Sequence, residues 1–103
     1  MKTYPKKRIE IIIEATLSRR MTEQLDRAGV TGYSIMPLIG GKGLSGSWSS
    51  EGQIGRASGM VAIICITDAA LADAVLEQIF QIVNRQMGVV SISDVAVIRP
   101  EHF

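Results

Sequence analysis

The first quarter of the chain changes from a strand pattern to a helical pattern of apolar positions. Residues 8–15 read Arg-Ile-Glu-Ile-Ile-Ile-Glu-Ala, a β-branched run that predicts a central strand. Residues 17–28 carry apolar side chains at helical spacing. These apolar positions are Leu17, Met21, Leu25 and Ala28. We expect Thr16 or Ser18 to cap the start of this helix and Gly29 to end it.

Two more strands are predicted from the next part of the chain. Residues 32–39 form the first of them, and Pro37 within it favours an edge or a bulge because proline donates no backbone hydrogen bond. Residues 60–67 form the second. Between them, residues 40–59 lose all periodicity. A connection of that length in a small domain is usually functional or disordered.

The last part of the chain predicts a helix and a final strand. The helix is expected to start after Asp68, a good N-cap, and to run to about Arg85. Its buried side would carry Leu71, Val75, Ile79 and either Ile82 or Val83. Gly88 ends the connection that follows, and residues 89–98 form the last strand.

The predicted element order is βαββαβ, which gives a single α+β domain over residues 1–103. Two strand–helix–strand units of this kind form a four-stranded antiparallel sheet with two helices on one face, the ferredoxin-like fold. The other face of the sheet would be open. That face would need a cover, so we expect an oligomer.

Composition narrows the function classes. Apolar residues make up 47% of the 103 residues, and the formal net charge is +1, which argues against nucleic-acid binding driven by basic charge. Cys65 is the only cysteine, so no disulfide forms within the chain and a reducing compartment fits. No signal-peptide pattern or bilayer-spanning run is present, so we expect a soluble, cytoplasmic protein. One cysteine and one histidine do not support a metal site.

The start of the 40–59 segment predicts an anion site. Gly40, Gly41, Lys42 and Gly43 directly follow a predicted strand. Glycines let the backbone approach a ligand, and successive N–H groups in such a turn can form an anion-binding nest. Lys42 adds a positive charge, so a phosphate or bicarbonate would suit the segment. The spacing is not that of a Walker A loop. The alternative is a flexible hairpin connection with no ligand.

Two side chains further along the segment add to this hypothesis. Trp48 is the only tryptophan and stands among serines and glycines. A large aromatic there buries little unless it docks on a partner, a ligand or the loop itself, so we predict a role in partner binding. Arg56 would pair with an anion or with Glu51.

At two further places the sequence resembles the PII signalling family. Residues 30–35 (Val-Thr-Gly-Tyr-Ser-Ile), which enter the glycine-rich segment, are similar to the family pattern, and so are residues 88–99. The Gly-Gly-Lys-Gly start, the short chain and the compact ending look closer to the branch linked to inorganic-carbon uptake. That branch includes carboxysome-associated PII proteins and regulators of bicarbonate transporters.

The resemblance implies a homotrimer that binds adenine nucleotides in clefts between subunits. It also implies that the loop between the second and third strands, the T-loop, meets a protein partner, here a transporter or a carboxysome-related protein. Ser34 then faces the adenine, Gly40 to Gly43 lie beside the phosphates, and Gly88 with Val89 forms a second phosphate turn. Arg99 and His102 would complete the cleft from the end of the chain. Gly41, Lys42 and Arg56 are the candidates for holding bicarbonate.

Departures from the family pattern narrow the ligand. The loop lacks the family's tyrosine, and Gln53 lies too far along to match the glutamine that serves 2-oxoglutarate and magnesium. Val89 stands where the family usually has a lysine. We therefore expect ADP or AMP, with bicarbonate as a further candidate, rather than ATP with magnesium.

Three other hypotheses stay open at this point. The first is a trimeric divalent-cation tolerance-type or other small-ligand-binding protein, although few histidines, cysteines or clustered carboxylates are present. The second is an amino-acid sensor of the ACT kind, whose connecting loop would normally be shorter. The third is an enzyme, but His102 has no nucleophile or orienting acid near it in the sequence, and we predict no catalytic activity.

Overall fold

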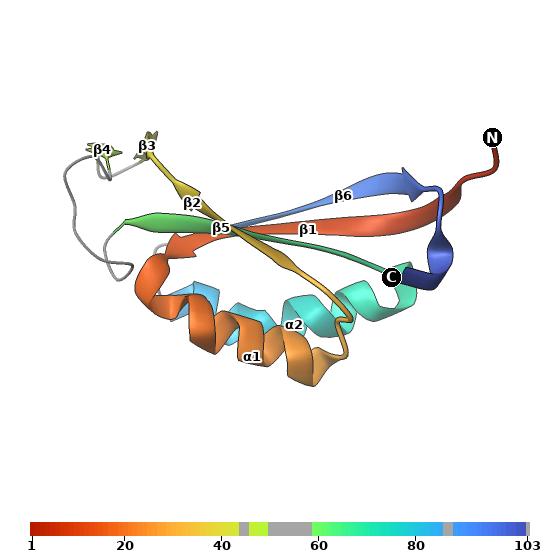
Figure 1. The fold of residues 1–103 in the computed structure, drawn as a ribbon. Helices are drawn as coiled ribbons and strands as arrows, with labels where there is room; N and C mark the ends of the chain where they lie inside the picture. The colour runs from red at the N-terminus through yellow and green to blue at the C-terminus, as the bar shows by residue number, and fades with distance from the viewer. Residues whose placement is uncertain (44–45, 50–58, 86–87, 103) are drawn as a thin grey trace.

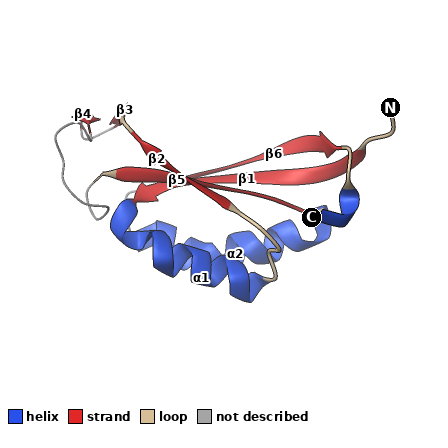
Figure 2. Cartoon of the chain, in the orientation of Figure 1, coloured by secondary structure: helices blue, strands red, loops and turns tan. Residues whose placement is uncertain are grey.

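The computed structural model describes residues 1–43, 46–49, 59–85 and 88–102. Its main body is a four-stranded antiparallel sheet with two helices on one face, the α+β, ferredoxin-like arrangement predicted from the sequence (Figure 1). The strands of this sheet are β1 (Tyr4–Glu14), β2 (Ser34–Leu38), β5 (Met60–Thr67) and β6 (Val89–Val97). The helices are α1 (Ser18–Ala28) and α2 (Ala69–Arg85). Figure 2 shows both helices lying below the sheet and the opposite face uncovered by any described element.

The sheet has the order β2-β5-β1-β6, so β1 is central and β2 is an edge strand. Pro37 lies in β2, which confirms the prediction of an edge position. β1 begins at Tyr4 instead of the predicted residue 8, because β6 pairs with it as far as Tyr4 and β5 as far as Lys7. Tyr4 is opposite Val97 and Lys7 is opposite Thr67. Ladder hydrogen bonds thus override the weak strand preference of the Pro-Lys-Lys segment.

The core lies between the sheet and the helices. Ile9, Ile11 and Ile13 of β1 alternate along one face, and each is fully buried. Directly across the ladder they pair with buried residues of β5, which are Cys65, Ile63 and Val61. The predicted inner faces of the helices are confirmed, since they contribute buried Met21, Leu25, Val75, Ile79 and Ile82. Burial of each such side chain contributes about 1.5–3 kcal/mol.

The two ends of α1 differ in how well the sequence predicted them. A 3-10 turn, η1 (Ala15–Leu17), precedes the helix, and Leu17 occupies the N-cap position with no side-chain cap. The prediction of Thr16 or Ser18 as the cap is therefore wrong. At the other end, Gly29 adopts a left-handed φ of 95° and its amide bonds to carbonyls in the last turn, as predicted.

Ion pairs involve each residue of the basic N-terminal run, Lys6, Lys7 and Arg8 of β1. Lys6 is only 8% exposed and pairs with Asp68, the residue directly before α2. Lys7 pairs with Asp94 across the β1–β6 ladder. Arg8 lies 2.9 Å from Glu10 on the same strand. The cations of this run are therefore neutralised locally.

Asp68→Ala should destabilise the fold by about 1–3 kcal/mol, because it leaves the buried Lys6 ammonium without its partner. Asp94→Ala is the matched control, since Asp94 is 83% exposed and its pair with Lys7 should contribute only about 0–1 kcal/mol. Urea unfolding followed by circular dichroism measures both. Equal losses in the two variants would contradict the assignment of the Lys6 pair as the stronger one.

Candidate functional site

The glycine-rich segment leaves the sheet as a hairpin. β3 (Gly40–Gly43) and β4 (Gly46–Ser49) form a separate two-stranded antiparallel sheet, in which Lys42 is opposite Ser47. The prediction of a segment without regular structure is therefore wrong for its first part. Glycine has no side chain but keeps its backbone donor and acceptor. In the hairpin these backbone groups pair between β3 and β4.

The hairpin also changes the expected anion chemistry of Gly40 to Gly43. A nest needs backbone that alternates in handedness, whereas these residues are extended. In the part of the chain that the structure describes, left-handed φ values occur only at Gly29, Gly46 and Gly59. The β3 backbone thus forms no nest in this structure. Lys42, the charged residue of β3, is exposed, and its role in anion binding stays a prediction.

Gly88 and Val89 lie at the same end of the sheet as the base of the hairpin. Val89 pairs with Ile12 near the end of β1, while Leu38, the last residue of β2, pairs with Met60 at the start of β5. Val89 is 62% exposed, so the position is open to a ligand. We call Gly40–Gly43, Gly88 and Val89 the loop-end group.

Packing explains why residue 88 is glycine. A Cβ atom added there would lie 2.9 Å from Cγ2 of Ile13 and 3.3 Å from the carbonyl oxygen of Ile12. Both distances are shorter than an ordinary contact, and Ile13 is fully buried and cannot easily move. The close approach of this backbone to β1 fixes the position of the turn.

Arg99 and His102 lie at the opposite end of the sheet. Arg99 follows β6 and is exposed, and His102 ends the 3-10 turn η2 (Pro100–His102). We call these two residues the tail-end group. The run of β6 from Val89 to Val97 is about 26 Å long at the usual rise of a strand. Within a single chain the two groups therefore lie far apart, as the positions of the hairpin and the C-terminus in Figure 1 show.

The remaining predicted site residues belong to neither the loop-end group nor the tail-end group. Ser34 is exposed at the start of β2 and pairs with Ile64, partway between the two groups. The backbone of Trp48 lies in β4, opposite Gly41. Arg56 lies outside the described residues, so its role stays a prediction.

Two cations of the candidate site form no ion pair among the described residues. In the ranges that the structure describes, the ion pairs involve Lys6, Lys7 and Arg8. Lys42 of the loop-end group and Arg99 of the tail-end group form no ion pair with these described residues. The loop-end group and the tail-end group thus each contain an exposed cation that can meet an anionic ligand.

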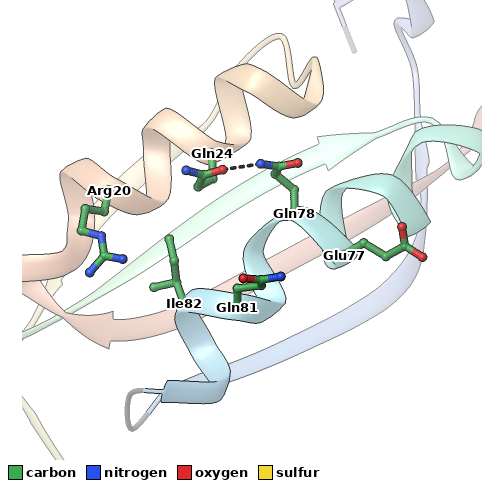
Figure 3. A pocket seen from close by; sticks show the side chains of 6 residues that line it. All are labelled: Arg20, Gln24, Glu77, Gln78, Gln81 and Ile82. Atoms are coloured by element: carbon green, nitrogen blue, oxygen red, sulfur yellow. Dashed lines mark hydrogen bonds between the residues drawn. The ribbon is translucent and has the colours of Figure 1, made fainter.

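A polar groove of about 350 Å³ between α1 and α2 escaped the sequence analysis (Figure 3). It is lined by Arg20, Gln24, Glu77, Gln78, Gln81 and Ile82. Nε2 of Gln78 donates a hydrogen bond to Oε1 of Gln24 across the two helices. The groove contains none of the predicted site residues, and only the packing of the two helices brings its lining together.

Cys65 belongs to the core, as predicted. Burial raises the pKa of its thiol, which lowers the fraction of reactive thiolate at neutral pH. Among the described residues, no three histidine, cysteine, aspartate or glutamate side chains gather at one place. The helices in the described ranges are also too short or too polar to span a membrane.

Residues 6–102 match the family model of the nitrogen regulatory protein P-II. The chain belongs to the P-II family. No curated protein is similar enough to count as a match.

Among solved structures, this P-II family member is similar to CPII, a nitrogen regulatory PII-like protein from Thiomonas intermedia. CPII bound to ADP, AMP and bicarbonate is 34% identical, with a TM-score of 0.91 over 99% of this chain and 96% of that chain. CPII bound to ADP and bicarbonate is also 34% identical, with a TM-score of 0.88 over 99% of this chain and 97% of that one. A Thermus thermophilus protein described as PII-like shares the fold at 22% identity, with a TM-score of 0.80 over 100% and 99% of the two chains.

Gly88→Ala should lower the stability of this P-II family member by about 1–3 kcal/mol, because the added methyl group overpacks against Ile13. Gly32→Ala is the matched control, since a Cβ there meets nothing within 4 Å. Thermal unfolding should show a lower Tm for the first variant and little change for the second. A wild-type Tm for Gly88→Ala would mean that the turn moves away from β1 at little cost.

Proposed function

We propose that the protein is a P-II-like sensor that binds ADP or AMP together with bicarbonate and acts through its T-loop. The observation that carries this proposal is the 34% identity with CPII over 99% of this chain, since CPII was solved with ADP, AMP and bicarbonate. The site residues and the nucleotide preference given below are part of the proposal. The role is regulatory, and no catalytic step is proposed.

The binding site in this proposal lies between subunits of a homotrimer. A single chain separates the loop-end group from the tail-end group by the length of β6. Head-to-tail contacts that close into a ring place the loop end of one chain beside the tail end of the next. The open face of the sheet, which no described element covers, would be buried in the same assembly.

The chemistry of the described side chains fits a nucleotide of low charge. Lys42 and Arg99 would each contact phosphate, and the hydroxyl of Ser34 would face the adenine. The turn at Gly88 would bring backbone close to the phosphates, and His102 would line the cleft. Val89 offers no charge beside that turn, which favours ADP or AMP over ATP. Bicarbonate would bind near Gly41 and Lys42, with Arg56 as a further ligand.

In this proposal the T-loop is the part of the sensor that contacts the regulated protein. Its hairpin, β3–β4, projects from the main sheet (Figure 1), which leaves it accessible to another protein. Trp48 would supply the main apolar contact, since aromatic residues dominate the binding energy of many protein interfaces. The partner would be a transporter or a carboxysome-related protein in inorganic-carbon metabolism, and the sensor would act in the cytoplasm or in association with the carboxysome.

Calorimetric titration with ADP, AMP, ATP and bicarbonate tests the proposed function. Lys42→Ala should weaken ADP or bicarbonate binding about tenfold, the loss expected for one charge-assisted contact, and should leave the Tm almost unchanged. Arg27→Ala is the matched control, because Arg27 is an exposed cation in the last turn of α1 and belongs to neither the loop-end group nor the tail-end group. No heat with any of these ligands would overturn the proposal, as would a strict monomer by mass in solution.

Val89→Lys tests the proposed nucleotide preference. The exposed position accepts a longer side chain, so the fold should be retained. A lysine beside the Gly88 turn adds a charge-assisted contact to phosphate, which should raise ATP affinity about fivefold or more and ADP affinity less. Titrations of both nucleotides give the ratio. An unchanged ratio would count against Val89 as a determinant, and Val89→Thr controls for the loss of the valine.

A further inference from the structure

The corner between β1 and α1 holds the exit of the T-loop. The amide of Ala15 donates a hydrogen bond to the carbonyl oxygen of Gly59, with an N···O distance of 2.9 Å. This bond continues the β1–β5 ladder one step beyond the last pair, Glu14 opposite Met60. Gly59 has a φ of 91°, so the chain turns through a left-handed residue immediately before it enters β5.

The same hydrogen bond serves the start of the helical segment. The first amides of a helix have no acceptor within the helix and need one from elsewhere. No side chain caps either η1 or α1. The carbonyl of Gly59, at the end of the T-loop, is the acceptor for the amide of Ala15, and Ala15 packs against the core. The loop exit cannot leave this corner without depriving a half-buried amide of its partner.

We propose that the backbone amide of Ala15 is a positioning group for the T-loop, an inference that rests on the proposed function. The loop's entry is fixed by the pairing of Leu38 with Met60, and its exit by the bond from Ala15 to Gly59. Holding both ends limits where the β3–β4 hairpin can lie relative to the main sheet. The hairpin that carries Lys42 is thereby pre-organised, and ligand binding costs less conformational entropy.

Ala15→Pro removes this one donor with little other change. Glu14 has φ −60° and ψ 140°, the extended backbone that a residue before proline prefers, and Ala15 is the first residue of η1, where proline is favoured. The proline ring takes the place of the amide hydrogen, so the carbonyl of Gly59 must move away. Ala15→Ser is the matched control, because it changes the side chain and keeps the amide.

Trp48 provides a readout that needs no ligand. It is the only tryptophan in the chain and lies in the hairpin, so acrylamide quenching of its fluorescence reports on the T-loop alone. Ala15→Pro should increase this quenching in the ligand-free protein and weaken ADP binding roughly threefold to tenfold, as expected when pre-organisation is lost. Ala15→Ser should match the wild type in both measurements. A purely structural role would instead lower the Tm and leave both unchanged.

Gly59→Ala approaches the same bond from the loop side. It retains the Ala15 donor but strains the left-handed backbone, so it should also raise Trp48 quenching and weaken ADP binding. If Ala15→Pro does not fold, this variant decides the question. Wild-type quenching and wild-type ADP affinity in the folded variants would overturn the positioning role. If the wild type binds no nucleotide, the proposed function fails, while the ligand-free quenching comparison still decides whether Ala15 holds the loop.

Discussion

Pairing of β1 on both of its sides is the constraint on which the rest of the structure depends. β5 and β6 are each hydrogen-bonded to it, and Ile9, Ile11 and Ile13 direct its apolar face toward the helices. A shift of one residue in either register would move those isoleucines to the open face, so both registers are strongly specified. Once β1 is placed, the first residues of β5 and β6 are placed with it. The exit of the T-loop and the turn at Gly88 therefore lie at a fixed end of the sheet.

Glycine has three different roles around the candidate site. At Gly59 the backbone is left-handed, which a side chain would strain. Gly88 lies so close to Ile12 and Ile13 that a Cβ atom has no room. In β3 the glycines are extended and paired with β4, so their lack of side chains leaves the hairpin narrow and exposed. A count of glycines in the sequence does not distinguish these roles.

Charge is distributed in a way that suits a sensor of small anions. Lys6 pairs with Asp68 before α2, Lys7 pairs with Asp94 of β6, and Arg8 pairs with Glu10 within β1. Lys42 and Arg99, at opposite ends of the sheet, are the exposed cations of the candidate site. Their separation within one chain is the physical reason to place the proposed nucleotide site between chains. It also makes the proposed binding dependent on assembly, because neither end of a lone chain carries both cations.

The sequence by itself determined the order of the four main-sheet strands and two α-helices, the inner faces of both helices, the end of α1 at Gly29 and the edge position of β2. These features depend on local periods and on single residues with restricted backbones, which act within a few positions of the chain. It also selected the residues of the candidate site through the glycine pattern and the family resemblance, and the family is confirmed.

Only the tertiary structure decided the features that depend on partners distant in the chain. The strand β1 extends to Tyr4 because β6 pairs with it that far, and the buried Lys6 has its ion-pair partner in Asp68, 62 residues away in the chain. The amide of Ala15, at the start of the η1 turn before α1, donates to the carbonyl of Gly59, and no side chain caps η1 or α1. The split of the site into two ends follows from strand order and register. No local pattern encodes these contacts, because each joins segments that meet only when the sheet is complete.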